Sequence, residues 1–268
     1  MKLNQFLSEH NVVTLEELDH YLARKGSGNR NTRNNLLTYY KGSGRLAQIR
    51  RGLYLVVPPG SSLETSPIDP HLITAKMTDD SVLGYHTAME FHGKAYSVFN
   101  RYHYLSKTRS VPLHFRSYVF QAVSFPKALS DKGEEMFGVI SHYRSGVKLR
   151  VTNFERTFVD ILDRPELTGS WEEVWRSLES IEFFDLDQVV KYVKFLDKAT
   201  TAAKVGFFLE QHKEALMVDE KYLDELKKLC PKQPHYMDDS ARKEGRLVKK
   251  WNIIVPNEIL DKIWEEVA

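Results

Sequence analysis

The sequence of 268 residues contains a single cysteine, Cys230, and lacks any long apolar run. One cysteine excludes an internal disulfide framework and favours a reducing compartment. No stretch approaches the ~20 apolar residues that a membrane-spanning helix needs, and no apolar run follows the first residues as it would in a signal peptide. These absences predict a soluble, cytoplasmic protein.

Acidic residues are also missing from one part of the chain. The formal net charge is only +2, but no Asp or Glu occurs between Asp19 and Glu64. The basic residues of the same stretch are Arg24, Lys25, Arg30, Arg33, Lys41, Arg45, Arg50 and Arg51. Positive charge concentrated on one small segment is typical of proteins that bind nucleic-acid phosphates. A solvated basic face without a partner would give the same charge pattern. The positions of these residues in the predicted helices and strands must therefore distinguish the two interpretations.

Hydrophobic spacing predicts three short helices in the first sixty residues. Leu3 to Leu7 form the first, and Thr14 to Glu17 form a capping box that opens the second, which ends near Lys25. The third lies between Gly26-Ser27-Gly28 and Gly42-Ser43-Gly44. Two apolar runs around Arg50-Arg51-Gly52 then predict a β-hairpin.

This order predicts an N-terminal winged helix-turn-helix over residues 1–60, in which the third helix enters the major groove by its N-terminal end. Arg can form paired hydrogen bonds with guanine and Asn with adenine. The hairpin tip would contact phosphate or the minor groove. The candidate DNA-binding residues are Arg24, Lys25, Asn29, Arg30, Asn31, Thr32, Arg33, Asn34, Lys41, Arg45, Arg50 and Arg51. A winged helix used only for protein contact is the alternative, but it does not explain why basic residues fall on the third helix and the hairpin tip.

The rest of the chain predicts a linker over residues 61–69 and a second domain over residues 70–268. Strands are expected at 102–105, 118–123, 137–140 and 147–151, and capping boxes at Thr152–Glu155 and Ser170–Glu173 open later helices. From about residue 200 the pattern predicts a helical extension. Strands early and helices late predict an α+β fold, with the winged helix-turn-helix followed by a larger mixed α/β domain.

The second domain lacks the motifs of common catalytic sites. It has no phosphate-binding loop, no H-E-x-x-H and no C-x-x-C. The lone Cys230 has no defined histidine partner, and His86 and His92 have poor spacing for one metal. Asp160 and Asp163 are more typical of a solvated acidic edge than of a carboxylate site. We therefore expect no enzyme activity, no metal and no cofactor.

Three segments resemble the AbiEi antitoxins of type IV abortive-infection toxin–antitoxin systems. They are Arg50 to Tyr54 at the hairpin, Leu83 to Gly93, and Val151 to Gly169, and their order and spacing match over roughly residues 1 to 200. The positions that carry the family pattern are Arg51, Gly52, Tyr54, Gly93, Thr152, Glu155, Arg156, Thr157 and Asp160. Asn153-Phe154 departs from the family pattern, because many members have Asp-Pro or a similar pair at these positions. Arg156 and Asp160 are four apart on one helix and could simply pair, so the motif can be structural rather than chemical.

The resemblance implies a transcriptional autorepressor that binds inverted repeats of double-stranded DNA in its own promoter and serves in phage defence. It also implies that the C-terminal domain counteracts a nucleotidyltransferase-like toxin, directly or indirectly. Two other classes stay open: a winged-helix transcription factor with a ligand- or protein-sensing C-terminal domain, and a DNA-guided nuclease. The nuclease would need clustered carboxylates and Lys around a metal, and the sequence shows no such cluster.

Overall fold

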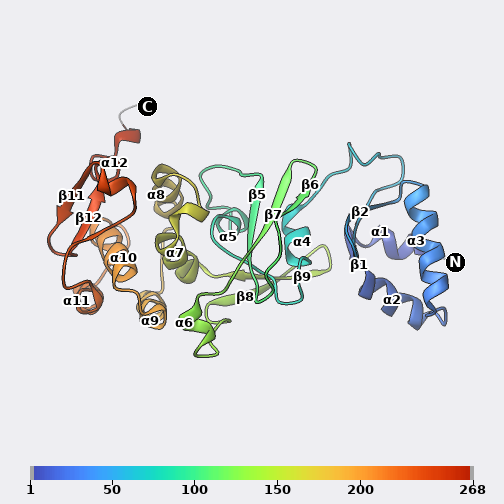
Figure 1. The fold of residues 1–268 in the computed structure, drawn as a ribbon, viewed down its shortest axis with the longest axis horizontal. Coiled ribbons are helices and arrows are strands. Elements are labelled where there is room, and N and C mark those ends of the chain that lie inside the picture. Colours follow the sequence, from blue (N-terminus) through green and yellow to red (C-terminus); the bar gives the residue numbers. More distant parts are fainter. Residues whose placement is uncertain (1–2, 266–268) are drawn as a thin grey trace. The chain divides into compact units, whose positions relative to one another are not determined.

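The computed structural model describes residues 3–265 (Figure 1). The chain forms two compact units that interleave along the sequence. Unit 1 contains Met1–Leu83, Asn100–Val123 and Ser141–Arg150, and unit 2 contains Gly84–Phe99, Ser124–Ile140 and Val151–Ala268. Both units combine helices and sheets, so the fold is α+β. No helix in the described part of the chain is long and apolar enough to cross a membrane.

The beginning of unit 1 is a three-helix segment with a small sheet. Its elements, in order, are α1 (Leu3–Ser8), β1 (Val12–Thr14), α2 (Leu15–Arg24), α3 (Arg30–Gly42), β2 (Leu46–Arg50) and β3 (Leu53–Val56). The three expected helices and the hairpin are present, and the capping box forms as predicted, with Thr14 Oγ1 accepting from the Glu17 amide and Glu17 accepting from the Thr14 amide. Strand β1 was not predicted. It pairs antiparallel with β3, which becomes the central strand in the order β1-β3-β2.

The remainder of unit 1 is built on a six-stranded sheet. It follows helix α4 (Pro70–Ala75), and its strands are β4 (Val82–Leu83), β5 (Arg101–Leu105), β6 (Leu113–Phe115), β7 (Tyr118–Val123), β8 (Val139–Arg144) and β9 (Val147–Thr152). The strand order is β6-β7-β5-β4-β9-β8, with β5 and β7 parallel. The strand expected at 137–140 begins only at Val139, because Gly138 takes a left-handed conformation with φ +64° and turns the chain.

The compact units do not coincide with the domains expected at 1–60 and 70–268. Lys76, directly after α4, donates to both carboxylate oxygens of Glu17 at 2.7 and 2.6 Å and to the Val12 carbonyl at 2.8 Å. Arg50 donates to the Met77 carbonyl. These bonds join the first sixty residues to the segment after the expected linker at 61–69. The Pro/Ser-rich stretch at 61–69 is therefore a loop, but it does not separate two domains, because the segments before and after it contact each other.

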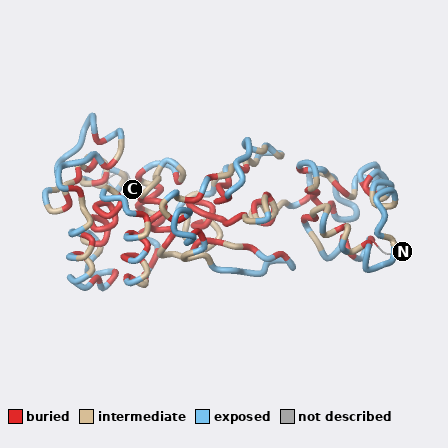
Figure 2. The backbone as a smooth tube through the Cα atoms, turned by 60° about the horizontal axis from the view of Figure 1, so that its bottom comes forward, coloured by how far each residue is buried: buried red, intermediate tan, exposed pale blue. Residues whose placement is uncertain are grey.

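Unit 2 has an apolar core that runs through its helices and C-terminal strands. Figure 2 colours all buried residues of the described chain red. The elements of unit 2 are α5 (His86–Phe91), α6 (Lys127–Ser130), α7 (Phe154–Asp163), η1 (Pro165–Leu167), α8 (Trp171–Glu179), α9 (Leu186–Leu196), α10 (Ala199–Gln211), α11 (Glu220–Leu229), β10 (His235–Tyr236), η2 (Ser240–Arg242), β11 (Gly245–Val248), β12 (Ile253–Pro256), α12 (Asn257–Leu260) and η3 (Ile263–Glu265). A Cβ added to Gly206 in α10 would lie 2.1 Å from the ring of the fully buried Trp251, so glycine allows this close approach.

Two expectations for unit 2 need correction. The C-terminal extension is not purely helical, because β10, β12 and β11 form a three-stranded sheet after α11. The capping box at Thr152 is wrong by one residue. Thr152 ends β9, and Asn153 caps α7 by accepting from the Arg156 amide at 3.0 Å. Glu155 accepts instead from the Asp185 amide at 3.0 Å, at the start of α9.

Candidate nucleic-acid interface

Helix α3 is fixed by two polar contacts at its N-terminal end. Asn29 is the N-cap, and its side-chain oxygen accepts from the Thr32 amide at 2.7 Å. Arg33 donates to Asp19 of α2 at 2.7 Å and to the side-chain oxygen of Asn34. The Arg33 side chain is only 16% exposed. Asn29 and Arg33 were both predicted to bind DNA, but in this structure their polar groups serve to start α3 and to hold it against α2.

The outer side of α3 carries the free polar groups. Arg30, Asn31 and Asn34 are exposed on its first turns, and the described residues provide no hydrogen-bond or ion-pair partner for Arg30 or Asn31. Asn35 and Tyr39 extend this exposed side, and 67% of Tyr39 is accessible. Neither was singled out in the sequence, although their spacing of four residues on one helix was a signal. This surface combines amide, guanidinium and aromatic groups without a carboxylate.

The β2–β3 hairpin presents one free arginine at its tip. Arg51 is exposed and has no partner among residues 3–265, whereas Arg50 is tied to the Met77 carbonyl. Gly52 takes the left-handed conformation that the tight turn requires, with φ +84°. Its carbonyl accepts from the Leu15 amide at 2.8 Å, so the tip lies beside the start of α2. The hairpin is therefore anchored at its tip and displays Arg51 from a defined position.

The other predicted contacts are distributed around the same segment. Arg45 is half-buried and donates to the Val57 carbonyl at 2.9 Å, which makes it part of the base of the hairpin. Arg24 and Lys25 are exposed at the end of α2, and Lys41 is exposed in the last turn of α3. Thr32 is half-buried and donates its amide to the cap. Of the twelve predicted residues, those with free charge are Arg24, Lys25, Arg30, Lys41 and Arg51.

Two of the three carboxylates of α2 are already occupied. Glu17 accepts from Lys76 and from the Thr14 amide, and although burial alone would raise the pKa of its carboxyl, these bonds hold that pKa below its ordinary value. Asp19 accepts from Arg33. Glu17 and Asp19 are thus compensated within the protein, which lowers their repulsion of an anionic ligand, whereas Glu16, the third carboxylate of α2, is exposed.

The positions that carry the resemblance to AbiEi antitoxins have contacts within the protein, most of them inside unit 2. Arg156 is fully buried and donates to Asp160 at 3.2 Å and to the carbonyls of Glu135 and Phe137 at 2.6 and 2.7 Å. Asp160 also accepts from the Tyr192 hydroxyl at 2.5 Å. Thr152 and Thr157 share a hydroxyl–hydroxyl bond of 2.7 Å. Gly93 ends α5 with φ +69°, and in unit 1 Tyr54 is buried on β3.

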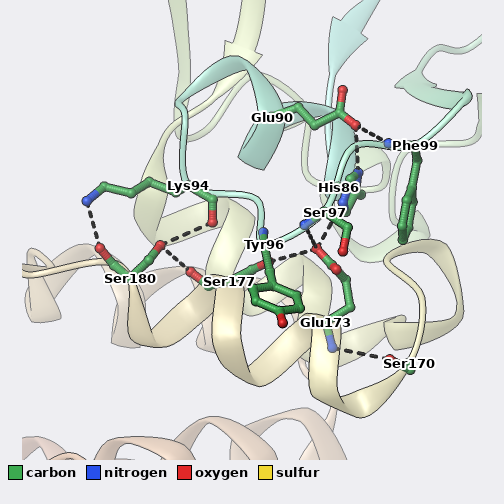
Figure 3. A network of polar contacts seen from close by, with 10 residues as sticks. All are labelled: His86, Glu90, Lys94, Tyr96, Ser97, Phe99, Ser170, Glu173, Ser177 and Ser180. Carbon is green, nitrogen blue, oxygen red and sulfur yellow. Dashed lines mark hydrogen bonds and ion pairs between the residues drawn. The ribbon is translucent and has the colours of Figure 1, made fainter. Parts of the chain in front are cut away.

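His86 is the centre of a second buried polar network (Figure 3). Its Nε2 lies 3.1 Å from Glu173 Oε1, its Nδ1 lies 3.4 Å from Glu90 Oε1, and its ring stacks on Phe99 at 3.9 Å. Glu173 also accepts from the Ser97 amide and the Ser177 hydroxyl. Burial would raise the pKa of Glu173, but these donors lower it to about 2. The predicted capping of α8 by Ser170 is present, but this carboxylate does not reach back to complete the box.

The remaining candidates for chemistry do not come together. His92 Nε2 lies 2.8 Å from the Thr152 carbonyl, away from the partners of His86. Cys230 is half-buried, its Sγ lies 3.4 Å from the Leu226 carbonyl, and burial raises the pKa of its thiol to about 11. A thiol with so high a pKa is a poor nucleophile at neutral pH. Among residues 3–265 no group of three or more His, Cys, Asp or Glu could hold a metal ion.

The comparison with solved structures shows a likeness of fold. The crystal structure of the RV2827C protein from Mycobacterium tuberculosis superposes with a TM-score of 0.60, at 16% sequence identity, over 95% of this chain and 90% of that chain. A likeness at this identity concerns the fold alone. No family model matches the chain, and neither does any curated protein.

Proposed function

We propose that residues 3–57 form a winged helix-turn-helix that binds double-stranded DNA, with α3 in the major groove and Arg51 of the β2–β3 hairpin on the backbone. The order of helices and strands supports this proposal because it is the order of a winged helix. The observation that carries it is the exposed side of α3, where Arg30 and Asn31 have no hydrogen-bond or ion-pair partner among residues 3–265, while Arg33 and Asn29 fix the helix.

The division of roles follows from the chemistry of each position. Arg30 and Asn31, at the N-terminal end of α3, can make the paired hydrogen bonds that distinguish guanine and adenine. Arg51 offers one charge from an anchored turn and suits a phosphate, which positions a protein without reading sequence. Arg24, Lys25 and Lys41 add positive charge around this surface.

Fluorescence anisotropy with a labelled duplex selected in vitro for binding, and with a scrambled duplex, tests the proposal. Affinity should fall steeply between about 50 and 200 mM salt because each neutralised phosphate releases counterions. Arg30→Ala and Asn31→Ala should each weaken binding to the selected duplex by ~1–3 kcal/mol and reduce its preference over the scrambled one. Arg51→Ala should weaken both duplexes about equally.

Lys228→Ala is the matched control, because Lys228 is an exposed cation on α11 of unit 2. It should leave both affinities unchanged. If the protein bound no duplex at 50 mM salt, or if Arg51→Ala alone changed the preferred sequence, the proposed interface would be wrong.

The resemblance to AbiEi antitoxins extends this proposal to the C-terminal part of the chain. In this extension the DNA-binding segment represses the protein's own promoter, and the C-terminal part counteracts a nucleotidyltransferase-like toxin. The contacts of Arg156, Asp160 and Thr152 support a structural role for the shared motif, so antagonism of the toxin would depend on the surface that this motif stabilises.

A further inference from the structure

Unit 2 contains a cleft that the proposed DNA-binding function does not use. It lies between the α7–α8 connection, α10 and the segment that carries η2, and its volume is about 650 Å³. This is within the ~300–1,000 Å³ typical of sites for small ligands. Five carboxylates and two cations line it, so its walls carry net negative charge.

Lys204 is the unusual member of this lining. It stands in the middle of α10, where every residue from Thr201 to Leu209 is buried, and only 6% of Lys204 is exposed. Its ammonium has no hydrogen-bond or ion-pair partner in the described part of the chain, and it lies 5.9 Å from the centre of the Trp171 ring. Burial lowers the pKa of Lys204 from its ordinary value. A buried charge without a partner is unfavourable for the folded protein by itself.

Two carboxylates of the cleft, Asp163 and Asp238, are already occupied by other groups. Asp163 accepts from Lys198 and from the Thr201 hydroxyl, at 2.7 and 2.6 Å. Asp238 accepts from Trp171 Nε1 at 2.5 Å and from the Ser240 hydroxyl at 2.7 Å. These bonds orient the side chains, and they leave Lys204 without a direct ion pair.

Glu258 is an acidic residue of the cleft that lacks a partner in the described part of the chain, as Lys204 does. It lines the same cleft, is half-buried, and has no hydrogen-bond or ion-pair partner among residues 3–265. Burial and the neighbouring Asp238 raise the pKa of its carboxyl. The cleft therefore offers one unpaired cation and one unpaired carboxylate that do not pair with each other.

We propose that this cleft binds a ligand of amino-acid chemistry, in which a carboxylate or carbonyl oxygen accepts from Lys204 and a cationic group pairs with Glu258. A polyanion such as a nucleotide is disfavoured because the walls are predominantly acidic. A simple polyamine would satisfy Glu258 but would leave Lys204 without an acceptor. The same chemistry occurs in a free basic amino acid and in a basic residue of a polypeptide.

Isothermal titration calorimetry on the full chain tests the proposal with three compounds. They are L-arginine, agmatine, which lacks the carboxylate, and the capped peptide acetyl-Gly-Arg-Gly-amide. The better of L-arginine and the peptide should bind about 10- to 100-fold more tightly than agmatine, because a hydrogen bond to a charged group contributes that much. Preference for L-arginine assigns a free amino acid, and preference for the peptide assigns a polypeptide.

Two variants locate the site. Lys204→Met should abolish the preference over agmatine without weakening agmatine, and Glu258→Gln should weaken all binding about 10-fold or more. Lys243→Met and Glu244→Gln, exposed neighbours outside the lining, should change nothing. Thermal unfolding without ligand should show Lys204→Met to be no less stable than the original protein, since an unpaired buried charge is removed.

Three outcomes would overturn the proposal. One is that none of the compounds binds at 10 mM. Another is that Lys204→Met or Glu258→Gln binds them as the original protein does. The third is that Lys204→Met lowers the unfolding temperature while the preference over agmatine survives, because Lys204 would then serve the fold alone.

Discussion

Replacing Arg33 tests whether this residue contacts DNA itself or positions α3, the helix that we propose contacts DNA. Arg33 donates to Asp19 at 2.7 Å, and the two side chains are 16% and 45% exposed. A partly exposed pair of this kind contributes ~0.2–1 kcal/mol to stability. Arg33→Ala should therefore lower the free energy of unfolding by that amount, measured by urea denaturation, and should weaken DNA binding by less than about 5-fold.

The partner residue supplies the decisive comparison. Asp19→Asn breaks the same ion pair, so α3 should be loosened to a similar degree, while one negative charge is removed from the segment that we propose binds DNA. Once Asp19 is replaced, the further change Arg33→Ala should have little additional effect on affinity, because the pair that it would break is already gone. Fluorescence anisotropy on the selected duplex measures all four proteins of the cycle.

Arg30→Ala is the control for this cycle. Arg30 has no partner in the described part of the chain, so its loss should leave the free energy of unfolding unchanged while affinity falls by ~1–3 kcal/mol. If Arg33→Ala costs as much affinity as Arg30→Ala in the Asp19→Asn protein, Arg33 reads DNA directly and the positioning role assigned to it is refuted.

Two further predictions concern unit 2 and the division of functions. With toxin and this protein expressed from unrelated promoters, the triple variant Arg30→Ala, Asn31→Ala, Arg51→Ala should still rescue growth, and loss of rescue at equal protein level would contradict the separation of roles. The folded-state pKa of Glu173, about 2, lies below the ordinary 4.5, so its ionised form stabilises the fold by about 3 kcal/mol above pH 4.5, and this stabilisation is lost as the pH falls toward 2. Glu173→Gln should therefore be less stable than the original protein at pH 7, and the difference should shrink as the pH falls from 4.5 toward 2 in urea denaturation; a constant difference would refute this, and Glu182→Gln, at an exposed position, is the control.

Local interactions explain which parts of the fold could be predicted. The capping box of Thr14 and Glu17 and the glycine turn at Gly52 depend on residues within three positions of each other, and both are present as expected. Strand β1 has three residues, and its pairing with β3 joins positions about forty apart, so periodicity could not indicate it. The strands of the C-terminal sheet are only two to four residues long and were not predicted for the same reason.

Misassigned polar roles have a different cause. The capping box predicted at Thr152 before α7 is wrong, because β9 continues to Thr152, whose hydroxyl bonds to Thr157, and Asn153 is the N-cap instead. Arg33 was grouped with Arg30 because the sequence shows charge without showing partners. Which arginine is free depends on where α2 places Asp19, and that position is set by packing between helices rather than by either helix alone.

The cleft around Lys204 shows which features of a site a sequence pattern can indicate and which require the three-dimensional structure. Its lining comes from four segments between Asp163 and Glu258, and no spacing in the sequence brings them together. Yet α10 is apolar on all sides from Ala202 to Leu209 except for this one lysine. A helix that is apolar all round is expected to be buried, so a lysine within it must either pair, reach solvent or face a cavity. The sequence could thus have identified Lys204 as unusual, but only the structure shows that it faces a cleft and lacks a partner there. Other lysines in apolar helices can be sorted by the same physical question.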